Sequence, residues 1–98
     1  MRTTTTRTIT GRVNSDGTVA AIGSGGWTGR KTATGTYQLD FLGQRLLGCT
    51  VTNSGNGGTW SLADVDTLTG SGCRVIHANP GASALIDVAF TFTATVAA

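Results

Sequence analysis

The chain has 98 residues, the size of a single domain, and 12% of them are charged. Globular domains usually carry about 25% charged residues, and the formal net charge here is only +2. The chain contains 19 Thr and 15 Gly residues and no Glu. Because Thr favours strands and Gly supplies turns, this composition argues against a helical protein. The small net charge argues against a charged disordered tail.

The first part of the chain reads as a β-hairpin followed by a loop. Thr8–Val13 alternates apolar and polar side chains and is followed by the turn residues Asn14–Gly17. Asn and Asp side chains bond nearby backbone amides, and Gly adopts positive φ, so this segment predicts a tight turn. Val19–Ile22 is a short apolar strand, and Gly23–Gly26 is a loop.

A second hairpin is predicted next. The strands Trp27–Thr32 and Thr36–Phe41 flank the turn Ala33–Gly35. In the second of these strands, aromatic and aliphatic side chains alternate with polar ones, so one face is expected in the core. The following segment, Leu42–Leu47, fits either a crossover loop or one short helical turn.

The middle of the chain returns to strands separated by turns. Cys49–Asn53 alternates again, and Asn53–Gly58 is the densest turn signal of the sequence. Trp60–Val65 is a strand in which Trp60 and Leu62 share one face. Another turn region is predicted at Thr67–Gly72.

The last part predicts two more strands. Arg74–Ala78 ends at Asn79–Gly81, because proline cannot donate to a strand ladder. Ile86–Val96 is predicted as one eleven-residue strand with an apolar core face and an opposite face of Ala, Asp and Thr. That flat face suits packing against another copy or exposure to solvent, and both interpretations remain at this point.

Seven or eight short strands at roughly 8–12-residue spacing predict an all-β antiparallel sandwich or a jelly-roll-like barrel. We expect one domain over residues 9–98, preceded by an extended N-terminal arm over residues 1–8. The arm is expected either to be poorly ordered or to dock on a neighbouring subunit by strand addition.

Few residues suit catalysis or metal binding. His77 is the only histidine, no Ser lies in a nucleophile elbow, and we expect a packed or interfacial imidazole rather than an enzyme. A Cys–His metal site would need Cys49, Cys73 and His77 to converge, although Cys73 and His77 would be about 13 Å apart in a strand. No metal and no cofactor are therefore expected, and the cysteines are expected to be buried thiols.

Two tryptophans start strands directly after glycine-rich loops. Trp27 and Trp60 would in that position form a platform on which sugar rings stack. Large aromatic side chains equally close the end of a small core or lie in a subunit interface. The sequence leaves both interpretations open, with core or interface packing favoured.

Three of the seven basic residues, Arg2, Arg7 and Arg12, lie at the start of the chain, where there is no acidic residue. They form a basic arm that suits an acidic protein surface. A nucleic-acid site would show a denser basic patch with interleaved aromatic residues, so no nucleic-acid partner is expected. No run of about 18 apolar residues exists, so no membrane span is expected. The start lacks an apolar signal core, so we expect synthesis in the cytoplasm without a signal peptide.

A recurrent pattern of Gly, aromatic and Thr positions runs through Gly11–Val19, Gly25–Thr28, Gly35–Phe41 and Asp87–Ala94. In this pattern the chain resembles the small β-sandwiches of bacteriophage virions, which occur in phage structural proteins and at the tips of tail fibres. It is also similar to the trimeric sandwiches of H-type lectins and C1q-like heads. The resemblance covers residues 9–96.

This resemblance implies a homotrimer, and a chain of this length has no room for a long fibre shaft. We therefore expect a capsid decoration (cement) protein, a structural protein of the virion on the capsid surface, made in the host cytoplasm. It would bind the major capsid protein through Arg2, Arg7 and Arg12 and stabilise the assembled shell. The alternative is a receptor- or carbohydrate-binding tip domain of a tail fibre or spike, with Trp27 and Trp60 as stacking residues.

Overall fold

The structure, a computed structural model, describes residues 5–54, 59–65, 70–79 and 84–97. Within these ranges the chain forms nine strands and no helix, which confirms the all-β class. The strands are β1 (Thr6–Val13), β2 (Val19–Ala21), β3 (Thr28–Ala33), β4 (Thr36–Asp40), β5 (Arg45–Asn53), β6 (Trp60–Val65), β7 (Gly72–Asn79), β8 (Ala84–Leu85) and β9 (Phe90–Ala97).

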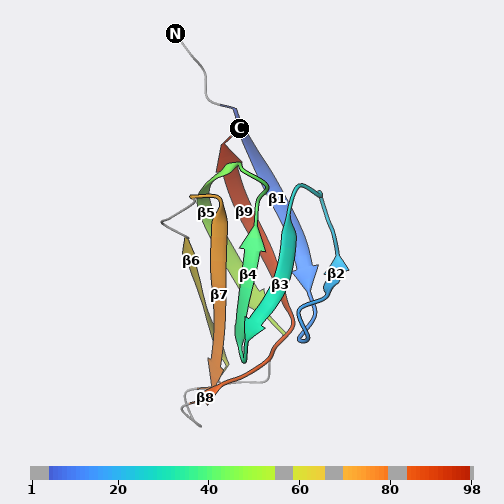
Figure 1. Ribbon diagram of the computed structural model, residues 1–98, viewed down its shortest axis with the longest axis vertical. Helices are drawn as coiled ribbons and strands as arrows, with labels where there is room; N and C mark the ends of the chain where they lie inside the picture. Colours follow the sequence, from blue (N-terminus) through green and yellow to red (C-terminus); the bar gives the residue numbers. More distant parts are fainter. Residues whose placement is uncertain (1–4, 55–58, 66–69, 80–83, 98) are drawn as a thin grey trace.

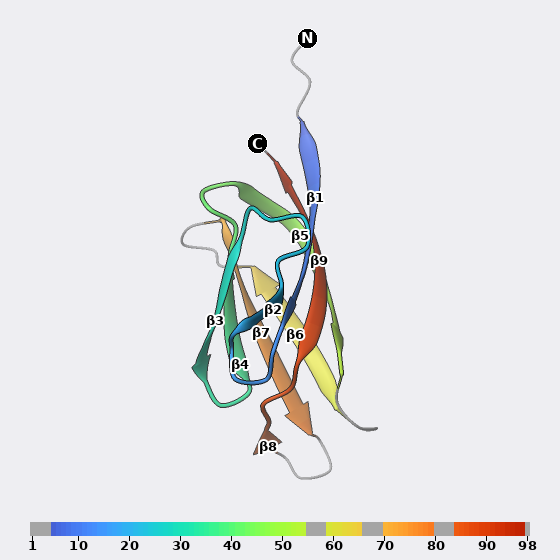
Figure 2. The ribbon, with the colours of Figure 1, turned by 90° about the vertical axis from the view of Figure 1, so that its right-hand side faces the viewer.

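Two antiparallel sheets pack face to face as a β-sandwich (Figures 1 and 2). Sheet A has the strand order β2-β1-β9-β5. Sheet B has the order β3-β4-β7-β6, with β8 paired to the end of β7. The first and last strands are neighbours, because β1 pairs with β9 from Thr6 opposite Ala97 to Val13 opposite Phe90. Contacts between β5 and β6 close one side of the sandwich, and β2 meets β3 at the other side.

The core lies between the sheets and follows the two-residue alternation of the strands. In β9 the aromatic and aliphatic side chains of Phe90–Val96 are buried, whereas the threonines between them are exposed. Trp27 and Phe41 both meet Phe92 edge to face, with ring centroids 4.7 and 5.9 Å apart. Removal of these rings from water, at roughly 25 cal/mol per Å², is the main favourable term holding the two sheets together.

Both predicted hairpins are present. The β1–β2 turn is closed by a bond of 2.9 Å from the Gly17 amide to the Asn14 carbonyl, and Gly17 has a φ of 92°. The β3–β4 turn contains Gly35, with a φ of 66°. The segment Leu42–Leu47, which the sequence left undecided between a crossover loop and a helical turn, is a loop only over residues 42–44. Leu42 and Gly43 turn the chain with φ of 54° and 82°, and residues 45–47 already belong to β5 of sheet A.

The predicted eleven-residue strand Ile86–Val96 is wrong in its length. Residues 86–89 are not in a strand and connect β8 to β9, which begins at Phe90. The reason is that backbone amides of this connector donate hydrogen bonds to groups outside sheet A. The Ile86 amide bonds the His77 carbonyl (3.2 Å), and the Val88 amide bonds the Tyr37 hydroxyl (3.2 Å). The predicted alternation of buried and exposed side chains holds within β9.

The boundary predicted between an arm and the sandwich also needs correction. Residues 6–8 belong to β1, where they pair with residues 95–97 of β9. The alternation of Thr with larger side chains therefore continues further toward the N-terminus than the predicted start at residue 9. Residues 1–4, including Arg2, lie outside the described part of the chain.

Candidate functional site

Trp27 is a core residue and not a stacking platform, which corrects the carbohydrate interpretation for this residue. Its side chain is 2% exposed, and its ring packs edge to face on Phe92. The indole Nε1 donates a bond of 2.8 Å to the Ile22 carbonyl, so its one polar group is satisfied inside the protein. A ring held in this way closes the end of the core, as the second interpretation of the sequence predicted.

Trp60 has the opposite environment. It is 46% exposed, on the outer face of sheet B. Strand register places it directly opposite Ala78 of β7, and Ala78 in turn lies opposite Leu85 of β8. Two residues further along β6, Leu62 lies opposite Ile76 on the same face. Trp60, Leu62, Ile76, Ala78 and Leu85 thus form one apolar patch.

The apolar patch is a contiguous outward surface rather than scattered side chains. Leu62 and Leu85 are 50% and 47% exposed, and the ring of Trp60 and the side chain of Leu85 flank Ala78, which is 6% exposed. Directly paired side chains in a sheet are about 4.5–5.5 Å apart at Cβ, so each of the five is in reach of its paired or same-face neighbour. A large apolar patch on a sheet face typically marks a binding surface.

The charged groups of the same face lie beyond Leu62, and Thr36 of β4 lies opposite Ile76 at the border of the patch. Asp64 and Arg74 pair across β6 and β7 with a contact of 3.1 Å, and both side chains are more than half exposed. Along a strand, Asp64 is about 13 Å from Trp60. Among the described residues, the cross-strand and same-face neighbours of Trp60 are therefore apolar. This favours a protein partner over a sugar, which needs hydrogen-bonding groups beside the stacked ring.

The candidate arginines do not form one contact surface. Arg7 lies opposite Val96 and Arg12 opposite Thr91, and these two residues of β9 face the core and the solvent respectively. Because the two arginines are five residues apart in one strand, their side chains leave opposite faces of sheet A. Arg12 donates a bond of 3.2 Å to the Thr91 hydroxyl. Arg2 lies outside the described residues.

His77 is packed in the core, which is one of the two environments, core or interface, that the sequence predicted for it. It is 0% exposed, and its ring lies 5.0 Å from that of Phe90 and 5.4 Å from that of Tyr37. Its Nδ1 is 2.7 Å from the Ser61 hydroxyl, which accepts a bond of 2.8 Å from the Asn53 side chain. Nε2 has no hydrogen-bond partner in the described part of the chain, and burial lowers the pKa of the imidazole.

This arrangement joins the sheets but is not a catalytic triad. A triad needs a carboxylate on the second ring nitrogen and an accessible hydroxyl on the first. Here the second nitrogen is buried and has no partner among the described residues, and the Asn53 side chain bonds Ser61. Asn53 is in β5 of sheet A, whereas the other two residues are in sheet B, so the chain of bonds connects the two layers.

Cys49 and Cys73 come together, but His77 does not join them. Both are free thiols, and each lies near enough to the other to shift its pKa. Cys73 and His77 are four residues apart in the extended strand β7, which keeps them about 13 Å apart. Within the described ranges, no group of three or more His, Cys, Asp and Glu residues is placed to hold a metal ion.

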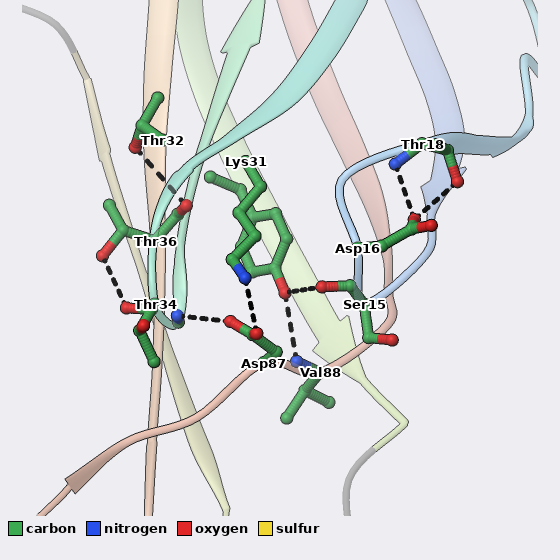
Figure 3. Close-up of polar contacts among 11 residues, drawn as sticks. Ser15, Asp16, Thr18, Lys31, Thr32, Thr34, Thr36, Asp87 and Val88 are labelled. Atoms are coloured by element: carbon green, nitrogen blue, oxygen red, sulfur yellow. Dashed lines mark hydrogen bonds and ion pairs between the residues drawn. The ribbon is translucent and has the colours of Figure 1, made fainter.

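A polar cluster fastens the end of the sandwich at which the hairpin turns lie (Figure 3). Asp87 accepts bonds from the Gly35 amide (2.7 Å) and from Lys31 Nζ (2.6 Å). The Tyr37 hydroxyl donates to the Ser15 carbonyl (2.6 Å) and accepts from the amide of the residue after Asp87. These contacts connect both hairpins to the β8–β9 connector. The Lys31 bond, with that of Gly35, lowers the pKa of Asp87.

Comparison with protein-family models, with curated proteins and with solved structures finds no match for this chain. In the part of the chain that the structure describes, there is no helix of the length and apolar character that a membrane crossing requires.

Sequence reasoning found Trp60 but not the apolar patch around it. The shared face of Trp60 and Leu62 was predicted, and such a face would ordinarily be assigned to the core. What the sequence does not show is that the small side chains of Ser61 and Ala63 face inward instead. The pairing of Trp60 with Ala78, and of Ala78 with Leu85, depends on which strands are neighbours in the folded sheet. In addition, β8 was not predicted as a separate strand.

Proposed function

We propose that the chain is a non-enzymatic structural protein of a bacteriophage virion, a capsid decoration protein that binds and stabilises the assembled shell. The virion assignment rests on the resemblance of its Gly, aromatic and Thr pattern to phage β-sandwiches. The observation that carries the binding role is the apolar patch on the outer face of sheet B. We place the contact with the major capsid protein on this patch.

The size of the apolar patch suits binding to a repeating surface. Three side chains, each about half exposed, offer on the order of a few hundred Å² of apolar area. A stable one-to-one complex typically buries about 800 Å² on each partner. A weak single contact becomes tight when linked copies bind neighbouring sites of a shell, and the proposed homotrimer supplies such linkage. Binding to the shell but not to free subunits stabilises the shell by mass action.

The test is co-sedimentation of the purified protein with empty, expanded capsids of the phage that encodes it, with host cells run in parallel. We expect saturable pelleting with capsids and not with cells. The variant Leu62→Arg places a charge in the apolar patch and should reduce capsid binding at least tenfold. Leu47→Arg is the matched control, because Leu47 is 47% exposed outside the patch. It should bind as the unchanged protein does.

Further experiments test the parts of the proposal separately. A chain lacking residues 1–5 and carrying Arg7→Ala and Arg12→Ala keeps the residues of β1 in place but removes all three arginines of the basic arm. If this variant loses binding and Leu62→Arg does not, the contact is the arm and not the apolar patch. If no form of the protein pellets with capsids, the decoration role is wrong. Sedimentation equilibrium of the free protein measures whether it is a trimer.

The half-exposed ring of Trp60 keeps the carbohydrate-binding tip as a second candidate function. It predicts pelleting with host cells alone, competition by cell-surface glycans, and loss of both with Trp60→Ala. Trp60→Ala should leave the fold intact, because this ring lies outside the core. Pelleting with cells that is insensitive to Trp60→Ala would contradict the stacking role of this residue.

A further inference from the structure

The two cysteines of the chain face each other across the sandwich. Cys49 lies opposite Ala94 in the β5–β9 ladder, and Ala94 is fully buried, so Cys49 faces inward from sheet A. Cys73 lies opposite Leu39 in the β4–β7 ladder and faces inward from sheet B. Strands β5 and β7 are in contact, and the amide three residues before Cys49 bonds the carbonyl three residues before Cys73 (2.8 Å). The two thiols are near enough for each to shift the pKa of the other.

The two sulfurs differ in their access to solvent. Cys73 is fully buried among the core residues, whereas Cys49 is only partly buried and packs at the edge of the core. Its strand, β5, is one of the two edge strands of sheet A. An oxidant therefore reaches the Cys49 sulfur first, and the Cys73 sulfur is held beside it as the partner for a second step.

We propose that Cys49 and Cys73 are a modification site that forms an intersheet disulfide when the folded protein meets an oxidising thiol–disulfide medium. With glutathione disulfide, the Cys49 thiolate attacks one sulfur and releases one glutathione. The Cys73 thiolate then attacks the Cys49 sulfur and releases the second. Two protein thiols lose two protons and two electrons, and one glutathione disulfide is reduced to two glutathione molecules.

The environment of the pair sets the rate of this reaction. The neighbouring Cys73 thiol, together with burial, raises the pKa of Cys49, and the neighbouring Cys49 thiol lowers the pKa of Cys73. Because the thiolate is the attacking species, the first step is slow at neutral pH and accelerates as the pH rises. In a reducing cytosol the pair stays as two thiols, and the cross-link follows transfer to an oxidising medium.

The cross-link would stabilise the fold by restricting the unfolded chain. It closes a loop of about 25 residues, for which the chain-entropy relation and the size of the domain predict a rise in Tm of roughly 15 °C. The cross-link joins β5, an edge strand of sheet A, to β7, an inner strand of sheet B. The inference does not depend on the proposed function, because it concerns the isolated folded chain.

The test is incubation of the purified protein in buffered mixtures of reduced and oxidised glutathione at several pH values, followed by alkylation of free thiols and intact-mass measurement. We expect both thiols to be lost together, with loss of two hydrogen atoms and no added glutathione. A non-reducing peptide map should link Cys49 to Cys73. The Tm should rise and return to its starting value after reduction.

Cys49→Ala and Cys73→Ala are the controls, and neither should form an intramolecular cross-link or gain in Tm. Three results would overturn the proposal. They are a stable glutathione adduct on Cys49 with Cys73 still free, a disulfide between two chains on a non-reducing gel, and two unreacted thiols after prolonged incubation at raised pH.

Discussion

His77 is a titratable side chain buried against aromatic rings, and it should make the stability of the fold depend on pH. Burial lowers the pKa of His77 in the folded protein, whereas its pKa in the unfolded chain is about 6.5. The unfolded state therefore binds this proton more readily, and stability is fully present above about pH 6.5 and is lost as the pH falls below it. We expect a slope of up to about 1.4 kcal/mol per pH unit in urea unfolding between about pH 6.5 and 5.

The control for this prediction is His77→Gln, which keeps a polar side chain but does not titrate. Its stability should be nearly flat over the same range, even if its absolute value is lower. Asp16 and Asp87 have lowered pKa values in the fold, so their contributions are lost only below about pH 4, outside this window. An equal slope in the glutamine variant would show that His77 is not the group responsible.

Gly11 is the one position in β1 where the ring of Trp27 leaves no room for a side chain. A Cβ at Gly11 would overlap the Trp27 ring and approach Phe92 to 3.0 Å. Gly11→Ala should therefore lower the free energy of unfolding by about 1–3 kcal/mol, the usual cost of overpacking a core. Gly48→Ala is the matched control, because a Cβ at Gly48 has open space and the residue is also in a strand. Chemical denaturation of both variants checks this, and equal effects would contradict it.

At the scale of elements, the polar cluster explains why the β8–β9 connector leaves the sheet. The Tyr37 hydroxyl satisfies the Ser15 carbonyl and the buried Val88 amide together. Tyr37→Phe should therefore cost about 1–3 kcal/mol of stability, because it leaves a buried amide without a partner. Lys31→Met should cost less than about 1 kcal/mol, because the Lys31–Asp87 pair is about one-third exposed and Asp87 keeps its bond to Gly35. Urea unfolding that ranks the two variants in the reverse order would contradict this account.

The sequence predicted the elements well where a local signal exists. Asn14–Gly17 and Ala33–Gly35 carry turn chemistry that does not depend on the rest of the fold, and both hairpins are present. The buried face of β9 follows from its alternation. The start of the last strand could not be predicted, because Asp87 and the next amide bond to partners 52 and 51 residues away in the sequence. Parts of the turns predicted at Asn53–Gly58, Thr67–Gly72 and Asn79–Gly81 lie outside the described residues.

The candidate site was less predictable than the fold, and the reason lies in the two tryptophans. Both follow glycine-rich loops and start or precede a strand, so the local signals are the same. Trp27 turns inward because Gly11 leaves space for its ring beneath it. Trp60 stays outside because its strand presents small side chains to the core. Both causes are contacts between distant segments, which a single sequence does not display.

At the scale of the whole molecule, the features proposed for binding lie at different ends of the sandwich. The apolar patch is at the end where β6 begins and β8 meets β7, and the start of β1 with Arg7 is at the other end (Figure 1). The cysteine pair lies inside, between β5 and β7. A partner bound on the patch would therefore leave the Arg7 end free and would not cover the inward-facing cysteines.

The pairing of β1 with β9 has a consequence for how the chain can be rewired. Thr6 and Ala97 are directly opposite each other in an antiparallel ladder, where paired Cα atoms are about 4.5–5.5 Å apart. A few flexible residues are enough to splice Ala97 onto Thr6, and a new start can be opened between Ala33 and Thr34, which are both exposed. Such a circular permutant would keep every strand neighbour while exchanging which pairings are local and which are distant along the chain.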